Sequence, residues 1–154
     1  MPEKQFKKQE METPVAGKVM LAFLSIAPQL LIVSLVSYII AVMGLNYFFE
    51  PHIVTSCVGA VISGVALGVG LLAISLSIYL LIERKFFEIL YNDPKSEQIF
   101  DNAVQYFWKG HKKNRPLEKR WEGTRKIYFK AIMLCAAQCV LTLIGFALMV
   151  AGIK

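Results

Sequence analysis

The sequence predicts an all-α fold: a polytopic membrane protein with three transmembrane helices and one cytoplasmic amphipathic helix. Three long segments, residues 19–49, 51–82 and 131–153, contain no Asp, Glu, Lys or Arg. A bilayer has a hydrocarbon core about 30 Å thick, which roughly 20 apolar residues of helix can cross. Backbone groups in lipid must be hydrogen-bonded within their own segment, which favours helix over an open strand. Each uncharged segment therefore predicts one span.

The composition agrees with a single lipid-facing domain. The chain has 154 residues, of which 56% are hydrophobic, and its mean hydropathy is +0.52. A net charge of +6 would also suit a nucleic-acid-binding protein. The cations, however, lie just outside the apolar segments, which is the pattern of membrane proteins. We therefore expect the lipid bilayer as a partner, and no nucleic acid.

The distribution of Lys and Arg predicts the orientation. Sixteen of the 17 cations fall on one side of the membrane if the N-terminus and the long loop share that side. Because cytoplasmic segments carry the excess of Lys and Arg, we expect both in the cytoplasm and the C-terminus outside. The membrane would be a plasma membrane or a bacterial inner membrane. The predicted N-terminal segment, first span, external turn, second span, cytoplasmic loop, third span and C-terminus cover residues 1–18, 19–43, 44–53, 54–82, 83–126, 127–152 and 153–154.

The first span contains Pro28, which predicts a kink. Proline removes one helical hydrogen bond, and membrane helices tolerate it where a neighbouring group satisfies the freed carbonyl. Ser25 lies close enough in sequence to do so. The kink has two interpretations, a gating hinge and a feature that only shapes packing.

The second span carries small residues on one helical face. Residues of this size let two helix backbones approach closely, and in lipid the resulting dispersion contacts largely replace the hydrophobic effect. The partner on this face is the first span, the third span, a second copy or another protein. The predicted helix-packing residues are Gly59, Ala60, Ser63, Gly64 and Gly68.

The third span has two intramembrane polar residues, Gln138 and Thr142. One interpretation makes Gln138 a ligand for a substrate or an ion. The other is an interhelical hydrogen bond, worth on the order of 1 kcal/mol. We favour the hydrogen bond, because an uncharged amide cannot relay a proton.

The cytoplasmic loop predicts an amphipathic helix over residues 94–109, since Asp93 suits an N-cap and Pro94 the first helical position. This helix would lie at the membrane interface against anionic lipid headgroups, dock into a groove of a partner protein, or fold back on the bundle. Its apolar face comprises Ile99, Phe100, Val104, Phe107 and Trp108. The basic surface beside it comprises Lys109, Lys112, Lys113, Arg115, Lys119 and Arg120.

The sequence has no recognisable catalytic or cofactor-binding motif. It lacks a Gly-rich phosphate loop, a Ser/His/Asp set and the ligand spacing of a zinc site. Cys57, Cys135 and Cys139 all fall within predicted spans, where a thiol packs as a small apolar group. We therefore expect no catalytic residue, no metal, no cofactor and no enzymatic activity.

These features favour a non-catalytic accessory or assembly subunit of a larger membrane complex. It would dock on other membrane protein subunits, or on a second copy, through the small-residue face and the basic amphipathic helix. A homo-oligomeric pore that uses the same glycine face is an alternative.

A further hypothesis comes from a resemblance. The basic-aromatic stretch at residues 83–88 and the ending at residues 152–154, together with three spans, an inside N-terminus and an outside C-terminus, loosely resemble immunity proteins of pore-forming colicins. The loop here is longer than in that pattern. The resemblance implies a membrane immunity or exclusion protein against a pore-forming toxin or a conjugation system.

Overall fold

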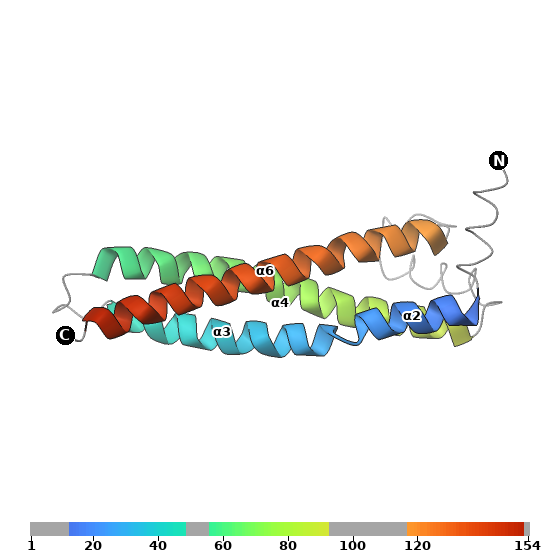
Figure 1. Ribbon diagram of the computed structural model, residues 1–154, viewed down its shortest axis with the longest axis horizontal. Helices are drawn as coiled ribbons and strands as arrows, with labels where there is room; N and C mark the ends of the chain where they lie inside the picture. The colour runs from blue at the N-terminus through green and yellow to red at the C-terminus, as the bar shows by residue number, and fades with distance from the viewer. Residues whose placement is uncertain (1–12, 49–55, 93–116, 153–154) are drawn as a thin grey trace, which may run out of the picture. The chain divides into compact units, whose positions relative to one another are not determined.

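The structure is a computed structural model, and it describes residues 13–48, 56–92 and 117–152. These residues form helices without any strand, as the sequence predicted (Figure 1). The helices are α2 (Pro14–Leu24), α3 (Ala27–Phe48), α4 (Ser56–Asn92) and α6 (Leu117–Gly152).

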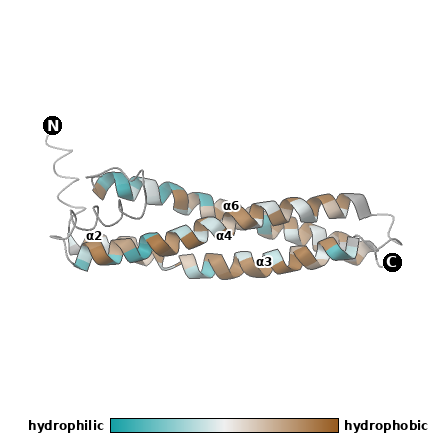
Figure 2. Ribbon diagram, turned by 180° about the vertical axis from the view of Figure 1, so that it is seen from behind, coloured by the Kyte–Doolittle hydropathy of each residue, from teal (hydrophilic) through white to brown (hydrophobic). Residues whose placement is uncertain are grey.

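Three stretches are long and apolar enough to cross a membrane, by length and composition: Val15–Tyr47, Val58–Asn92 and Leu117–Leu148. The prediction of three apolar helices is thus confirmed. Figure 2 shows the hydrophobic residues along these helices, and the hydrophilic ones are concentrated in the last turns of α4 and the first turns of α6. The amphipathic helix predicted at residues 94–109 lies outside the described residues, together with its apolar face.

The break predicted at Pro28 divides the first hydrophobic segment into two helices. α2 ends at Leu24, and Pro28 lies in the first turn of α3. Backbone N–H groups in the first turn of a helix have no intrahelical acceptor, so proline, which lacks an N–H, costs no hydrogen bond there. The Ser25 hydroxyl donates to the Ala22 carbonyl oxygen at 2.6 Å. This hydrogen bond lies at the C-terminal end of α2, where Ser25 is the C-cap residue.

Two boundaries differ from the sequence prediction. Residues 44–53 were expected to form a turn, but α3 continues through Gly44 to Phe48. Gly44 is buried, and a Cβ there would lie 3.4 Å from the Ser63 hydroxyl, so this glycine serves close helix packing. Likewise α6 begins at Leu117 rather than at residue 127. Glu118 in its first turn favours a helix N-terminus, because the helix dipole is positive there.

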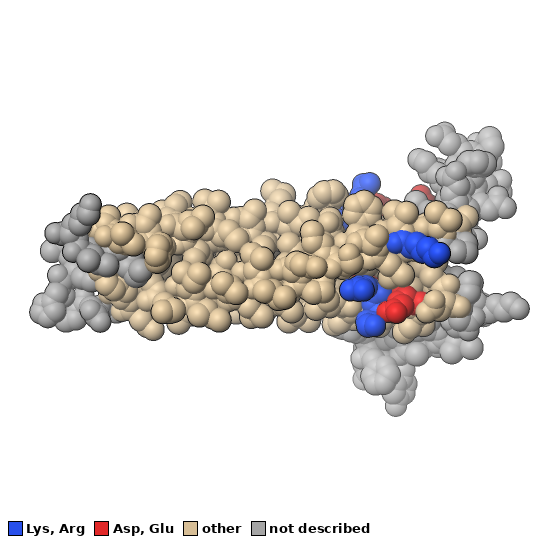
Figure 3. All heavy atoms as spheres, turned by 60° about the horizontal axis from the view of Figure 1, so that its bottom comes forward, with Lys and Arg blue, Asp and Glu red and all other residues tan. Residues whose placement is uncertain are grey.

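The chain divides into two compact units. The first comprises Met1–Ile26 and Leu80–Ile127, and we call it the charged unit. The second comprises Ala27–Tyr79 and Tyr128–Lys154, and we call it the small-residue unit. In the described part of the chain, Lys130 is the sole charged residue of the small-residue unit. Figure 3 shows Lys, Arg, Asp and Glu side chains close to one another on the face in view.

Candidate functional site

The interior of the small-residue unit is built from small and polar side chains. On α4 the buried positions follow alternating steps of four and three residues, a spacing typical of left-handed helix packing. The same spacing recurs on α3 and α6. No larger apolar side chain is buried among the described residues of this unit. The buried positions are Ala27, Ser34, Ser37, Ala41, Gly44, Gly59, Ser63, Ala66, Gly70, Ala73, Ser77, Ala131, Cys135, Gln138, Thr142 and Gly145.

Ser63 of α4 faces a glycine on each of the other two helices. A Cβ at Gly44 of α3 would lie 3.4 Å from the Ser63 Oγ, and a Cβ at Gly145 of α6 would lie 3.3 Å from it. A Cβ at Gly44 would thus be in van der Waals contact with this hydroxyl, and one at Gly145 would be slightly closer than usual. The three helices therefore approach one another around Ser63.

Gln138 makes a second three-helix contact. Its side chain is fully buried, and its Nε2 donates to the Ser34 carbonyl oxygen of α3 at 2.9 Å. On α4, a Cβ at Gly70 would lie 2.5 Å from that Nε2 and 3.1 Å from the Tyr38 ring. The amide thus occupies the space that the missing Gly70 side chain leaves.

Neighbouring polar groups extend this contact between α3 and α6. The Thr142 hydroxyl donates to the Ser37 carbonyl oxygen at 3.5 Å, and the Ser37 hydroxyl lies 3.5 Å from the Cys139 sulfur. Among the described residues, the Gln138 Oε1 and Ser34 Oγ atoms are buried without a hydrogen-bond partner. The geometry is that of the interhelical hydrogen bond we favoured for Gln138, and Thr142 joins the same face.

The predicted packing face is only partly the one that packs within the chain. Gly59 and Ser63 are buried and Ala60 is half-buried, but Gly64 and Gly68 are exposed. No described atom lies within 4 Å of a Cβ at Gly64 or Gly68. The prediction followed a constant spacing of four, which drifts around the helix and leaves the buried face. Sequence reasoning missed the other buried residues of this face, Ala66, Gly70, Ala73 and Ser77, although steps of three and four would have found them.

The charged unit is joined instead by an aromatic cluster. The Trp121 Nε1 of α6 donates to the Tyr91 hydroxyl of α4 at 3.0 Å. The Tyr91 ring stacks on Phe87 with centroids 6.3 Å apart. A Cβ at Gly17 of α2 would lie 2.5 Å from the Tyr91 ring, so only glycine lets α2 approach this closely. Sequence reasoning did not single out Gly17, Phe87 or Tyr91.

Polar contacts and ion pairs add to this cluster. The Thr124 hydroxyl donates to a Glu83 carboxylate oxygen at 3.3 Å, which links α6 to α4. Lys85 pairs with Glu88 at 2.9 Å, within one turn of the same helix. The Lys126–Glu122 pair of α6 spans 2.7 Å. Both ion pairs are exposed.

The predicted basic surface is described in part. Lys119 is exposed, but Arg120 is buried, with 8% of its surface exposed. Arg120 therefore does not belong to an open basic surface, because its position on α6 turns it toward the interior of its unit. The remaining members, Lys109, Lys112, Lys113 and Arg115, lie outside the described residues.

Within residues 13–48, 56–92 and 117–152, no group of three or more His, Cys, Asp or Glu side chains could hold a metal ion. Cys135 and Cys139 are free thiols. No known family model, curated protein or solved structure matches this chain.

Proposed function

We propose that this chain is a non-catalytic accessory or assembly subunit of a larger membrane complex. The observation that carries the proposal is the exposed pair Gly64 and Gly68 on α4, which no described side chain covers. This pair lies within the candidate span Val58–Asn92. A membrane helix of another protein would pack against it.

The physical argument concerns what glycine costs and what it provides at these two positions. A glycine inside a helix is about 1 kcal/mol less favourable than alanine. Facing lipid, it would give nothing in return, since lipid chains contact a larger side chain at least as well. Facing a second helix, it permits a close backbone approach that gains many dispersion contacts. The chain's own helices pack against the buried face of α4 that contains Ser63, Ala66 and Gly70. The face that contains Gly64 and Gly68 is exposed, so it is available for a partner.

The proposal includes the orientation expected from the cation distribution. The N-terminus and the segment at residues 83–126 would lie in the cytoplasm, and Lys154 outside. The basic amphipathic helix at residues 94–109 would provide a second contact with the complex. Labelling of a Lys154→Cys variant by a membrane-impermeant reagent in intact cells supports this orientation, whereas labelling only after permeabilisation contradicts it.

The assembly role is tested by purifying the tagged full chain in a mild detergent and identifying co-purifying membrane proteins. We expect Gly64→Leu and Gly68→Leu to lose the partner by tenfold or more while keeping their helix content. Ala136→Leu is the matched control, because it places the same side chain at an exposed small residue of α6.

Equal partner retention in all three variants would contradict the proposal. Recovery of only a second copy of the chain, lost in the two glycine variants, would identify self-association as the use of this face. The immunity hypothesis stays a prediction from resemblance, since the described contacts do not bear on it.

A further inference from the structure

Two exposed lysines of the charged unit lie among exposed apolar residues. On α2, Lys18 shares the exposed side of the helix with Val15 and Val19, of which 70% and 46% of the surface is exposed. Such a surface fits neither water, which disfavours the apolar groups, nor hydrocarbon, which disfavours the cation. It fits the boundary between them, where a lysine lays its apolar stem along the hydrocarbon and its ammonium among the headgroups.

α4 repeats this arrangement. Lys85 is exposed between Ile82, three residues before it, and Ile89, four residues after it, so all three lie on one helical face. Its partner Glu88 shares that region, but the pair is exposed, with 74% of the lysine side chain accessible. An exposed ion pair is weak, because water screens it, and a phosphate can therefore compete for the ammonium.

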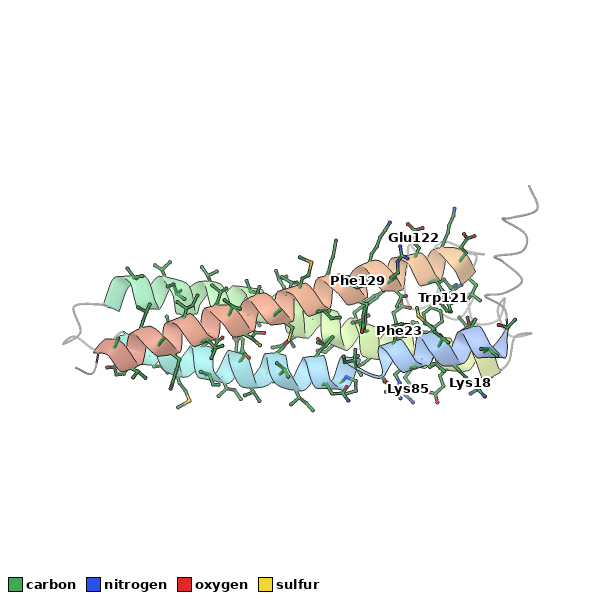
Figure 4. The ribbon with its side chains drawn as sticks, in the orientation of Figure 1. Lys18, Phe23, Lys85, Trp121, Glu122 and Phe129 are labelled. Carbon is green, nitrogen blue, oxygen red and sulfur yellow. The ribbon has the colours of Figure 1, made fainter. Side chains whose placement is uncertain are left out.

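The two lysines come from helices that touch. Gly17, the neighbour of Lys18, contacts the Tyr91 ring of α4. Lys85 precedes Tyr91 by six residues, or about 9 Å along the helix axis. Figure 4 shows the Lys18 and Lys85 side chains extending from the same side of the ribbon. The two lysines therefore lie on one surface formed by α2 and α4, and this surface is large enough for a few lipid headgroups.

The exposed positions of α6 in the same unit have a different character. Glu118, Lys119, Glu122, Arg125 and Lys126 are all exposed, and no large apolar side chain interrupts them. Charges of both signs suit water or a polar partner. Within residues 117–125 of α6, the exposed cations therefore lack the exposed Val and Ile neighbours of Lys18 and Lys85, whereas the exposed Phe129 follows Lys126 by three residues.

We infer that the α2–α4 side of the charged unit binds anionic phospholipid, with Lys18 and Lys85 on the headgroup phosphates and Val19, Ile82 and Ile89 against the acyl chains. A lipid supplies both the negative charge and the apolar surface that this side requires. An acidic protein segment would account for the cations alone. Headgroup attraction contributes on the order of 1 kcal/mol per cation near the surface. The inference is independent of the assembly role, since it concerns other residues and another partner.

The test is a titration of phosphatidylglycerol into the detergent-solubilised full chain, with bound lipid counted by native mass spectrometry. We expect the double variant Lys18→Gln, Lys85→Gln to bind phosphatidylglycerol about tenfold more weakly. The control is Lys119→Gln, which removes a lysine charge from an exposed position of α6 that has Glu122 and Gly123 three and four residues later, and it should bind like the unchanged protein. Lys18→Arg, Lys85→Arg should retain binding, which separates lost charge from lost folding.

Three outcomes would overturn the inference. The first is equal binding of phosphatidylglycerol and phosphatidylcholine by the unchanged protein, which would mean that the two lysines do not recognise the negative charge of the headgroup. The second is an equal loss per charge removed in Lys119→Gln and in Lys18→Gln, Lys85→Gln, which would mean a diffuse charge effect rather than a site. The third is unchanged binding by Lys18→Gln, Lys85→Gln.

Discussion

The small-residue unit and the charged unit bury different side chains, although α4 and α6 run through both. In the small-residue unit the buried positions hold Gly, Ala, Ser, Cys, Thr and one Gln, while large apolar residues such as Ile32 and Leu143 are exposed. The described interior of the charged unit instead includes Met20, Leu24 and Phe87. Leu80 and Leu90 complete its buried apolar set.

The two sets of buried residues match two general ways in which helices pack. Between lipid-facing helices the hydrophobic effect gives no net attraction, so close backbone packing and interhelical hydrogen bonds hold the helices together. Where water competes, burying Leu, Met and Phe is the dominant favourable contribution. One helix, α4, therefore changes its packing residues along its length, from Gly and Ala to Leu and Phe.

The largest expected effect is at Gly70 in the small-residue unit. Gly70→Leu places a branched side chain where the Gln138 amide and the Tyr38 ring lie, at 2.5 and 3.1 Å from the Cβ position. Overpacking of this kind should lower the free energy of unfolding by about 3 kcal/mol. The measurement is SDS-induced unfolding in mixed micelles, followed by circular dichroism.

Gly68→Leu is the control for that variant, because no described atom lies within 4 Å of its Cβ position. It should leave the stability of the isolated chain within about 0.5 kcal/mol of the unchanged protein. Equal destabilisation by both variants would contradict the assignment of Gly70 to the buried face of α4 and of Gly68 to its exposed face.

A smaller loss is expected at Tyr91 in the charged unit. Tyr91→Phe keeps the ring against Gly17 and Phe87 but removes the hydroxyl that accepts from Trp121. Loss of one partly buried hydrogen bond should cost about 1 kcal/mol. A double-mutant cycle with Trp121→Phe measures the pair directly, and a coupling energy of zero would mean that this bond does not hold α6 to α4.

Gln138→Leu should cost still less, about 0.6 kcal/mol, the average of measured interhelical hydrogen bonds in a membrane protein. Leucine fills most of the buried volume and also removes the unpartnered Gln138 Oε1. Equilibrium unfolding as above checks the value. Should the variant lose function while its stability stays unchanged, Gln138 would be a ligand, as in the alternative interpretation.

The smallest effect concerns the exposed pair Lys126–Glu122 of α6. Glu122→Gln should destabilise by about 0.3 kcal/mol, because exposed pairs four residues apart on a helix contribute little. The loss should vanish at high salt, which the same unfolding experiment at 50 mM and 1 M NaCl would detect. A salt-independent loss well above 1 kcal/mol would place this pair in a less exposed setting than the structure gives it.

Much of the fold follows from local features that can be recognised directly in the sequence. Uncharged runs of about 20 residues or more predict membrane-crossing helices whatever their neighbours are, and Pro28 breaks the first of them for the same local reason. The residues of the candidate packing site were harder to predict from the sequence. Gly44, read as part of a turn, is a packing residue of α3, because glycine serves both purposes and only the nearby Ser63 hydroxyl distinguishes them.

By itself, then, the sequence determined the helical class and the three apolar helices. Only the tertiary structure decided that Gly70 packs while Gly64 and Gly68 are exposed, that Arg120 is buried, and that Tyr91 joins α2 and α6 to α4. The physical reason is that helix formation in an apolar run depends on composition within that run. Which of two small-residue faces is buried depends on the atoms that the other helices bring against it.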